Sequence, residues 1–453
     1  MNPLKLSALA EMSGSVLLCG DPEALALRIC TDTRKLIPGD LFVALKGARH
    51  DGNAHLAEAA AKGAMGALCD AEASSGLPEN FGVLLTADSL AGLTIMASSW
   101  RSNLDLKSIV VTGSSGKTTT KDFTAGIFRR KFRVTATEGN LNNHIGLPLS
   151  ILAADREDEI GVWEIGMNHR GEISPLAGLA RPHLAIITGI GTAHIEFLGS
   201  RDEISREKGD LLEKLPSGGV GIIPSGDDYR SELRSRTTAR IFEVGIGCGD
   251  LRAENIVSEG EGSRFLLDGE YGRSEAYLPI PGKHMVLNAL LATAAGLLSG
   301  ISLEECSGAL AEMKPGKGRL SRVLRRGVCL IDDTYNANPD SMVAALETLS
   351  SLPVTGRKIA VLGRMGELGV HASEGYVRVG NACASMANVL VCIGEESVAM
   401  AKSAINQGMV EVHEVPDNRE AARLISSLAV SGDVVLFKGS RSAELEDVIQ
   451  NFI

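Results

Sequence analysis

The sequence contains few aromatic residues and no long apolar run. Aromatic side chains make up 4% of the 453 residues, so its cores must be built mainly from aliphatic side chains. No apolar stretch reaches the roughly 18 residues that a membrane span requires. The first twenty residues, which Glu11 interrupts, do not resemble a cleavable leader. We therefore expect a cytoplasmic protein without a membrane span.

The sequence also has no Cys-x-x-Cys pair and no long run of positive charge. The eight cysteines are scattered and none forms a Cys-x-x-Cys pair, which is typical of reduced thiols and excludes a zinc ribbon or a disulfide framework. The formal net charge is −11 and there is no long run of Lys or Arg, so nucleic acid and acidic membranes are poor partners. If the protein handles anions, it does so in local pockets.

The chain is long, rich in glycine and shows alternating strand-like and helix-like segments. Because 453 residues exceed what one core usually organises, we predict three α/β domains. They are a small N-terminal α/β unit at 1–104, a central parallel-sheet domain at 105–313 and a Rossmann-like, doubly wound domain at 314–453. A Pro/Gly-rich break at 313–318 marks the second boundary.

Short apolar runs predict the strands of these domains. We expect strands at 41–45, 82–85, 108–112, 161–165, 184–189, 328–332, 358–362, 389–393 and 434–437. Helices are predicted at 55–62, 90–101 and 285–298. The polar, Gly-rich stretch 245–273 is predicted to be β-rich.

A phosphate-binding loop follows the strand predicted at 108–112. Its sequence is Gly113-Ser114-Ser115-Gly116-Lys117-Thr118-Thr119, placed between a strand and a helix, and it is a shortened form of the general phosphate-loop pattern. Backbone N–H groups can surround a phosphate there, Lys117 can neutralise β/γ oxygens and Thr118 can ligate Mg²⁺. This pattern predicts ATP binding. A Gly-rich turn with an incidental lysine would leave the Lys-Thr-Thr order unexplained.

Three further polar residues stand in the central domain. Glu164 ends an apolar strand, where a hard cation beside the phosphates needs an oxygen ligand. His194 and Lys208 lie in the segments that follow the strand predicted at 184–189. For Glu164 we favour a metal ligand, with a solvated strand end as the alternative. Taken alone, His194 and Lys208 are more often solvated or satisfied polar residues.

Together these segments resemble the Mur ligase family, whose loop pattern is matched by Gly113 to Thr119. The resemblance covers nearly the whole chain and includes the Thr31-Asp-Thr-Arg34 segment, the Gly139-Asn140-Leu-Asn-Asn143 segment and the Pro281-Gly-Lys-His segment. It implies ATP-dependent amide bond formation with two Mg²⁺ ions. It also implies that Lys208 is carbamylated by CO₂ and supports the second Mg²⁺ together with His194.

The resemblance assigns further residues of this chain to binding roles. Asn288 is expected to contact adenine, Arg319 the ATP phosphates and Asp333 the ribose. The other substrate-binding candidates are Thr33 and Arg34 for the diphosphate or uracil of a UDP-linked substrate, Asn140 and Asn143 in the central domain, and Tyr335 and Asn336 on the nucleotide side of the cleft. Each nucleotide contact has a plain alternative: a polar residue on an apolar helix for Asn288, a solvated linker charge for Arg319 and a turn former for Asp333.

The C-terminal segment Tyr335-Asn336-Ala-Asn-Pro339 resembles the members of that family that add D-alanyl-D-alanine to a UDP-N-acetylmuramoyl-tripeptide. The segment Leu362-Gly-Arg364-Met-Gly-Glu-Leu-Gly369 is similar to their Leu-Gly-Asp-Met-x-Glu-Leu-Gly, but Arg364 replaces the customary Asp. The resemblance therefore implies these two substrates, an acyl-phosphate intermediate, and domain closure about linkers near Leu104 and Met313. We expect a monomer.

Three other functions stay open on the sequence alone. A tripeptide-forming or folylpolyglutamate-like ligase is disfavoured because the Asp-Asn-Pro-Arg signature is absent and no His replaces Tyr335-Asn336. A regulatory UDP-sugar-binding protein would not need Lys117, Glu164 and Lys208 together. A kinase or GTPase is a third alternative, and the Asn-Lys-x-Asp loop that reads guanine is missing.

Overall fold

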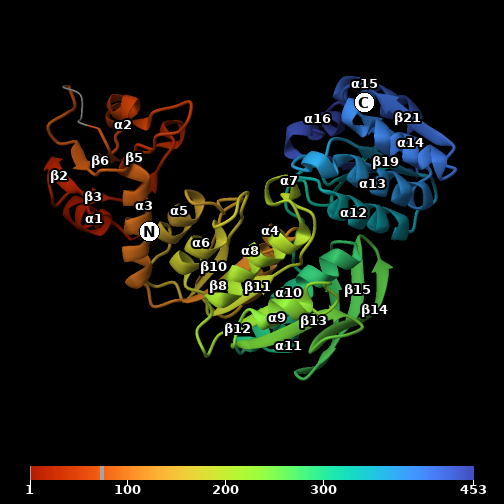
Figure 1. The fold of residues 1–453 in the computed structure, drawn as a ribbon, viewed down its shortest axis with the longest axis horizontal. Helices are drawn as coiled ribbons and strands as arrows, with labels where there is room; N and C mark the ends of the chain where they lie inside the picture. Colours follow the sequence, from red (N-terminus) through yellow and green to blue (C-terminus); the bar gives the residue numbers. More distant parts are fainter. Residues whose placement is uncertain (1, 72–75, 453) are drawn as a thin grey trace.

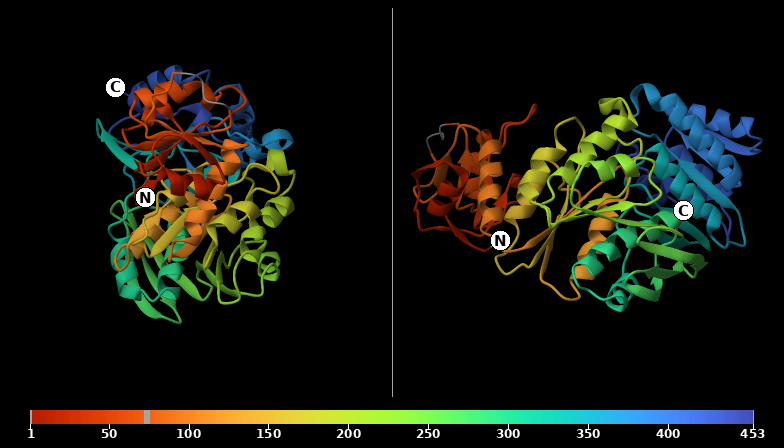
Figure 2. Two further views of the ribbon diagram at one scale, coloured as in Figure 1. Left: turned by 90° about the vertical axis from the view of Figure 1, so that its left-hand side faces the viewer. Right: turned by 60° about the horizontal axis from the view of Figure 1, so that its bottom comes forward.

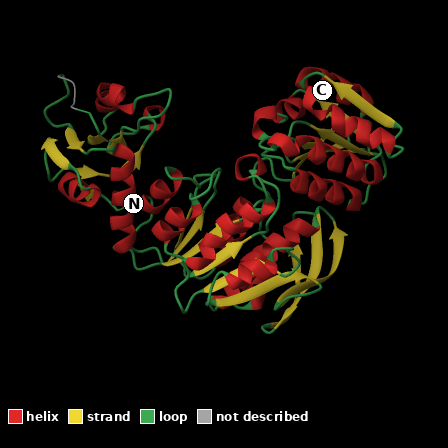
Figure 3. Ribbon diagram, in the orientation of Figure 1, coloured by secondary structure: helices red, strands yellow, loops and turns green. Residues whose placement is uncertain are grey.

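The computed structural model describes residues 2–71 and 76–452. It forms three α/β lobes in chain order, with the N- and C-terminal lobes at the two ends of the central one (Figure 1). In each lobe helices pack on a β-sheet (Figure 3). The expected three-domain α/β fold is confirmed. Within the described ranges, no helix is long and apolar enough to cross a membrane.

The N-terminal lobe is a five-stranded sheet of order β2-β7-β6-β5-β4, beside a separate β1–β3 pair. Its strands are β1 (Leu4–Lys5), β2 (Val16–Cys19), β3 (Leu25–Ala26), β4 (Arg28–Cys30), β5 (Asp40–Val43), β6 (Gly66–Cys69) and β7 (Gly82–Leu85). Its helices are α1 (Leu6–Ser13), η1 (Thr33–Lys35), η2 (Gly52–His55), α2 (Leu56–Ala61) and α3 (Ser89–Ser102).

A buried arginine fixes the connection between this lobe and the next. Arg101, near the end of α3, is 4% exposed. Its guanidinium donates to the carbonyl oxygens of Ala180, Leu104 and Leu106 at 3.2–3.4 Å and to Ser108 Oγ at 3.0 Å. The linker near Leu104 is therefore held against the central lobe in this structure.

Replacing Arg101 by methionine is expected to lower the free energy of unfolding by about 3 kcal/mol, because several buried acceptors lose their donor. Urea unfolding would measure the change. Arg130→Met is the matched control, since Arg130 is more exposed and pairs at the surface with Glu312; it should change stability by less than about 1 kcal/mol. Equal effects of both substitutions would contradict the assigned role.

The central lobe is a nine-stranded sheet of order β16-β15-β14-β13-β12-β11-β8-β10-β9. Its strands are β8 (Lys107–Thr112), β9 (Val134–Ala136), β10 (Ile160–Glu164), β11 (Leu184–Ile187), β12 (Val220–Pro224), β13 (Arg240–Ile246), β14 (Leu251–Glu259), β15 (Gly262–Gly269) and β16 (Gly272–Leu278). Its helices are α4 (Lys117–Phe128), α5 (Gly146–Leu152), α6 (Ile173–Ala180), α7 (Ile195–Leu198), α8 (Arg201–Glu213), α9 (Arg230–Ser235), α10 (Lys283–Leu298) and α11 (Leu303–Leu310).

This sheet changes character along its width. In sheet order, neighbouring strands pair in parallel along β9-β10-β8-β11-β12-β13-β14. The last two pairs, β14–β15 and β15–β16, are antiparallel. The antiparallel part confirms the β-rich stretch predicted at 245–273. The apolar helix α10 packs against α4 and the sheet, as Figure 2 shows. Its residues are buried almost all round, which agrees with an internal helix.

The C-terminal lobe is a six-stranded sheet of order β17-β18-β22-β19-β20-β21, parallel except for the edge strand β17. Its strands are β17 (Ser321–Arg325), β18 (Val328–Asp332), β19 (Lys358–Leu362), β20 (Val389–Ile393), β21 (Glu411–Val415) and β22 (Val434–Lys438). Its helices are α12 (Pro339–Ser351), η3 (Gly369–His371), α13 (Ala372–Met386), η4 (Glu395–Ser397), α14 (Val398–Asn406), α15 (Asn418–Leu428), η5 (Arg441–Ala443) and α16 (Glu446–Gln450).

Candidate nucleotide and ligase site

A cavity of about 580 Å³ lies between the central and C-terminal lobes and gathers most of the predicted site residues. The predicted residues that line it are Ser114, Ser115, Gly116, Lys117, Thr118, Thr119, Asn140, Asn143, Glu164, His194, Asn288, Arg319, Asp333, Tyr335 and Asn336. Most of them follow the carboxyl ends of strands in the two sheets, and Asn288 lies on α10. The carboxyl ends of parallel strands are where open α/β sheets bind ligands.

The phosphate loop is shaped by two glycines in the left-handed half of backbone space. Gly113 has φ 146° and Gly116 has φ 81°. A Cβ on Gly113 would lie 1.9 Å from Thr188 Oγ1, and one on Gly116 would lie 2.5 Å from Asn288 Oδ1. Only glycine therefore allows the loop to fold this tightly. Gly116 also leaves the N-terminus of α4 without a side-chain cap, so that its N–H groups remain free for an anion.

Lys117 begins α4 and turns back over the loop. Its Nζ donates to the carbonyl oxygen of Gly113 at 2.8 Å. Burial lowers the pKa of this lysine, and the nearby Glu164 carboxylate opposes that shift. The ammonium group thus lies at the loop where a β- or γ-phosphate would accept its hydrogen bonds.

Glu164, the last residue of β10, has one satisfied and one unsatisfied oxygen. It is 1% exposed, and its Oε1 accepts from Asn142 Nδ2 at 2.7 Å. Its buried Oε2 has no hydrogen-bond partner. A buried carboxylate oxygen without a partner costs free energy unless a cation or donor binds it, so this atom suits a metal ligand.

His194 is held by a residue of the other lobe. Its Nδ1 lies 2.6 Å from Glu367 Oε2, and both residues have left-handed backbones, with φ 65° and 60°. Such strain in non-glycine residues is retained where surrounding contacts enforce it. Burial lowers the pKa of His194, and the close Glu367 carboxylate opposes the shift.

Lys208 lies on α8 and is fully buried. Its Nζ has no hydrogen-bond partner, and burial, followed by the charge of Lys117, lowers its pKa well below the usual value. A lowered pKa favours the neutral amine, which is the nucleophilic form of a lysine. Lys208 does not line the cavity. Among the described residues, no group of three or more His, Cys, Asp or Glu side chains forms a ready-made metal cluster.

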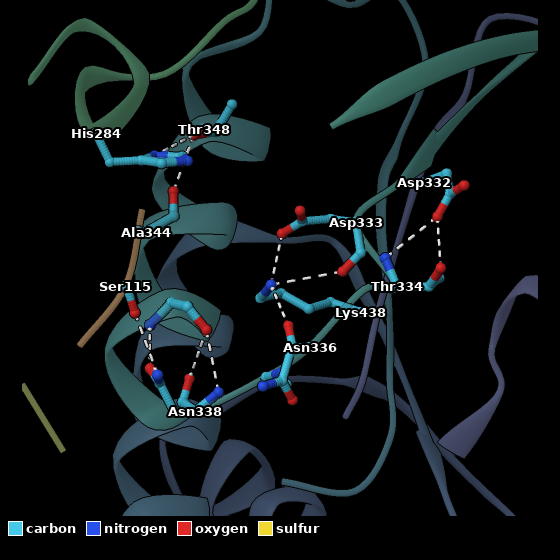
Figure 4. Close-up of polar contacts among 12 residues, drawn as sticks. Ser115, His284, Asp332, Asp333, Thr334, Asn336, Asn338, Ala344, Thr348 and Lys438 are labelled. Atoms are coloured by element: carbon cyan, nitrogen blue, oxygen red, sulfur yellow. Dashed lines mark hydrogen bonds and ion pairs between the residues drawn. The ribbon is translucent and has the colours of Figure 1, made fainter. Parts of the chain in front are cut away.

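The C-terminal wall carries Arg319, Asp333, Tyr335 and Asn336. The Arg319 guanidinium stacks over the Tyr335 ring at 4.0 Å. The Tyr335-Asn-Ala-Asn-Pro motif leads into α12, because Asn338 forms a capping box with Ser341 and Pro339 occupies the first turn. Asn338 Nδ2 also donates to Ser115 Oγ at 3.2 Å (Figure 4), so this wall touches the phosphate loop.

Thr33 and Arg34 lie apart from this cavity, in η1 of the N-terminal lobe. Arg34 is exposed and pairs with Asp32 at 2.8 Å, while the carbonyl oxygen of Thr33 accepts from Lys62 Nζ at 2.9 Å. The structure does not join them to the nucleotide cleft.

Several cavity residues escaped the sequence interpretation, notably Lys438, His284 and Asn142. Lys438 ends β22 beside Asp333. His284 is partly buried, and its desolvation, together with the nearby charge of Lys438, lowers its pKa to about 4. Lys438 directly follows the strand predicted at 434–437, and this position at the carboxyl end of a parallel strand is a signal that could have identified it. Asn142 could not have been identified in this way, because it contacts Glu164 from a loop whose path cannot be predicted from local sequence.

Fold and cavity together define a phosphate-loop ATPase whose nucleotide cleft is shared by two lobes. Two family models match the chain: the Mur ligase middle domain at residues 111–296 and the Mur ligase glutamate ligase domain at residues 318–441.

The similar proteins agree with these models over nearly the full length. The UDP-N-acetylmuramoyl-tripeptide–D-alanyl-D-alanine ligases of Bacillus subtilis and Escherichia coli are 36% and 34% identical, covering 94% and 93% of this chain and 93% and 92% of theirs. A crystal structure of MurF from Acinetobacter baumannii superposes with a TM-score of 0.90 at 33% identity, covering 100% of this chain and 99% of that one. MurF ligase from Thermotoga maritima, solved in complex with ADP, superposes with a TM-score of 0.84 at 27% identity over 94% and 96%.

The chain belongs to the Mur ligase family. It is accordingly an ATP-dependent amide ligase of peptidoglycan synthesis.

Proposed function

We propose that this chain joins D-alanyl-D-alanine to UDP-N-acetylmuramoyl-tripeptide at the expense of ATP. The observation that carries the proposal is that the phosphate loop, the partnerless oxygen of Glu164 and the Tyr335–Asn338 wall meet in one cavity. The named relatives catalyse this ligation, and the C-terminal wall carries the motif that distinguishes them.

The lobes divide the work in this proposal. Residues 1–104 hold the UDP part of the acceptor through Thr33 and Arg34. Residues 105–313 hold ATP, with Asn140 and Asn143 facing the acceptor. Residues 314–453 hold the ribose side of ATP and the incoming dipeptide. The proposal includes a monomer as the active form, and the need for ATP supports a cytoplasmic location.

The side chains support activation of the acceptor carboxylate by ATP. Lys117 and the N–H groups at the start of α4 hold the phosphates and offset the repulsion between the γ-phosphate and the acceptor carboxylate. Arg319 and Asn288 fix the two ends of the nucleotide. The carboxylate attacks the γ-phosphorus to give an acyl phosphate and ADP. The dipeptide amine then displaces phosphate through a tetrahedral intermediate, losing a proton.

Two Mg²⁺ ions belong to this proposal. Thr118 and the free oxygen of Glu164, which both line the cavity, would hold one. His194, which also lines it, and a carbamate on Lys208, which does not line it in this structure, would hold the other. When bound, the ions supply positive charge beside the transferring phosphoryl group. The depressed pKa and partnerless Nζ of Lys208 support the carbamate.

The test is phosphate release from ATP and Mg²⁺ with UDP-N-acetylmuramoyl-tripeptide, with and without D-alanyl-D-alanine, while mass spectrometry follows the UDP-linked product. We expect phosphate and a product heavier by one dipeptide minus water, both only when the dipeptide is present. A product formed instead with a single amino acid would reassign the chain to a tripeptide-forming ligase. ATP binding without any product would favour a non-catalytic binding protein.

Glu367→Ala is expected to lower turnover about 10- to 100-fold and to raise the Mg²⁺ concentration needed for half activity, because His194 loses the carboxylate that orients its ring. A magnesium titration of phosphate release would measure both. Glu374→Ala, at an exposed position on α13, is the control and should behave like the wild type. An unchanged magnesium requirement in Glu367→Ala would contradict this role.

A further inference from the structure

Lys438 is a buried lysine at the cavity wall to which neither the sequence nor the proposed mechanism gives a role. It is the last residue of β22, the strand between β18 and β19, and it is 4% exposed. Its Nζ lies 2.6 Å from Asp333 Oδ2 and donates to the carbonyl oxygen of Asn336 at 2.9 Å (Figure 4). Both partners line the same cavity.

The charge on Lys438 supports the charge on Asp333. Burial raises the pKa of the Asp333 carboxyl, and the Lys438 ammonium opposes that rise. The backbone N–H of Leu320 also favours the ionised carboxylate. A carboxylate can accept about four hydrogen bonds, so Asp333 keeps acceptor positions for a ligand in the cavity. Without the lysine, the buried carboxylate would keep only the charge of Arg319 and the Leu320 N–H in favour of its ionised form, and it would take up a proton more readily.

The second contact of Lys438 holds the loop that follows Asp333. By fixing the carbonyl of Asn336, the ammonium sets the path of the segment that leads to Asn338, whose side chain reaches Ser115 in the phosphate loop. Lys438 therefore connects the Asp333 carboxylate with the segment whose Asn338 contacts the phosphate loop. A lysine with only a packing role would not need both contacts.

We infer, on the basis of the proposed function, that Lys438 is a positioning residue that orients the Asp333 carboxylate toward the vicinal hydroxyls of the ATP ribose. The Asp333–Lys438 pair thereby selects ribonucleotides over deoxyribonucleotides. Asp333 makes the contact, and Lys438 acts through it.

The test compares kcat/KM for ATP, 2′-deoxy-ATP and 3′-deoxy-ATP in the wild type and in Lys438→Met. The wild type is expected to prefer ATP by roughly 10- to 100-fold over at least one deoxy analogue, as for a hydrogen bond to a charged acceptor. In Lys438→Met the preference should fall below about threefold. Lys438→Arg, which keeps the charge, should retain most of it. Because each preference is a ratio within one preparation, partial loss of folded enzyme does not affect it.

Lys358→Met is the matched control. Lys358 lies at the amino end of the neighbouring strand β19, at the opposite edge of the sheet from the cavity, and donates to the carbonyl oxygen of Ser350. It should keep the wild-type preference. An unchanged preference in Lys438→Met, or a wild type that treats all three nucleotides alike, would overturn the inference.

Failure of the ligase assignment would give a different result. In that case the wild type forms no dipeptide product, whereas calorimetry with ADP and its 2′- and 3′-deoxy forms still reports the preference for the ribose and its loss in Lys438→Met.

Discussion

Replacing Lys117 by methionine is expected to reduce turnover about 100- to 1,000-fold, the range found when one preorganised donor to a developing charge is removed. Methionine fills similar space but carries no charge, so the γ-phosphate and the acceptor carboxylate repel each other without compensation. The substitution also removes the hydrogen bond from Lys117 Nζ to the Gly113 carbonyl oxygen at 2.8 Å. Such a bond contributes only about 1 kcal/mol to the free energy of unfolding. The variant should therefore fold.

Phosphate release under saturating substrates measures this effect. Lys131→Met is the control, because Lys131 lies exposed just beyond the end of α4 and its Nζ donates to the Gly300 carbonyl at 2.8 Å. The control should retain near wild-type turnover. If Lys117→Met kept more than a tenth of the wild-type rate, the lysine would not be the group that stabilises the transferring phosphoryl.

Lys208→Met is expected to separate activity from stability. The substitution removes a buried amine that has no hydrogen-bond partner, and replacing such a group by an apolar one of similar volume is often neutral or stabilising. We therefore expect an equal or higher Tm. Turnover should nevertheless fall at least about 100-fold, because the carbamate that would support a metal ion cannot form.

Carbon dioxide gives an independent readout of Lys208. Wild-type turnover should decline in CO₂-depleted buffer and recover when bicarbonate is added, while the residual rate of Lys208→Met should not respond. A wild-type rate that is insensitive to bicarbonate, together with an active Lys208→Met, would show that the lysine acts only as packing.

The strands were the most predictable part of the fold. Those predicted at 82–85, 328–332, 358–362 and 389–393 are confirmed with the same bounds, because each is a buried apolar run between polar turns. Edge strands such as β17 and β21 escaped prediction. Both strands are only partly buried, and charged residues interrupt their apolar residues. Their sequences are Ser-Arg-Val-Leu-Arg for β17 and Glu-Val-His-Glu-Val for β21.

The site was predictable where one short segment carries its whole geometry. The phosphate loop depends on Gly113, Gly116 and Lys117, which lie within one five-residue segment. The partners of these residues were not predictable, since the Glu367 contact with His194 and the Lys438 contact with Asp333 join segments more than 100 residues apart. Lys208 became a candidate only through the family resemblance, because burial of a lysine cannot be read from its neighbours.

The anchoring of Arg101 has a consequence for substrate length. Because this side chain fastens the first linker to the central lobe, closure about the linker near Leu104 would have to break these buried hydrogen bonds. We therefore expect the N-terminal and central lobes to move together, with closure about the second predicted linker at 313–318. In the proposed function, an acceptor whose nucleotide end is held by the first lobe would then reach the phosphate loop over a constant distance. We expect a peptide stem one residue shorter to bind at its nucleotide end yet to stop short of the γ-phosphate.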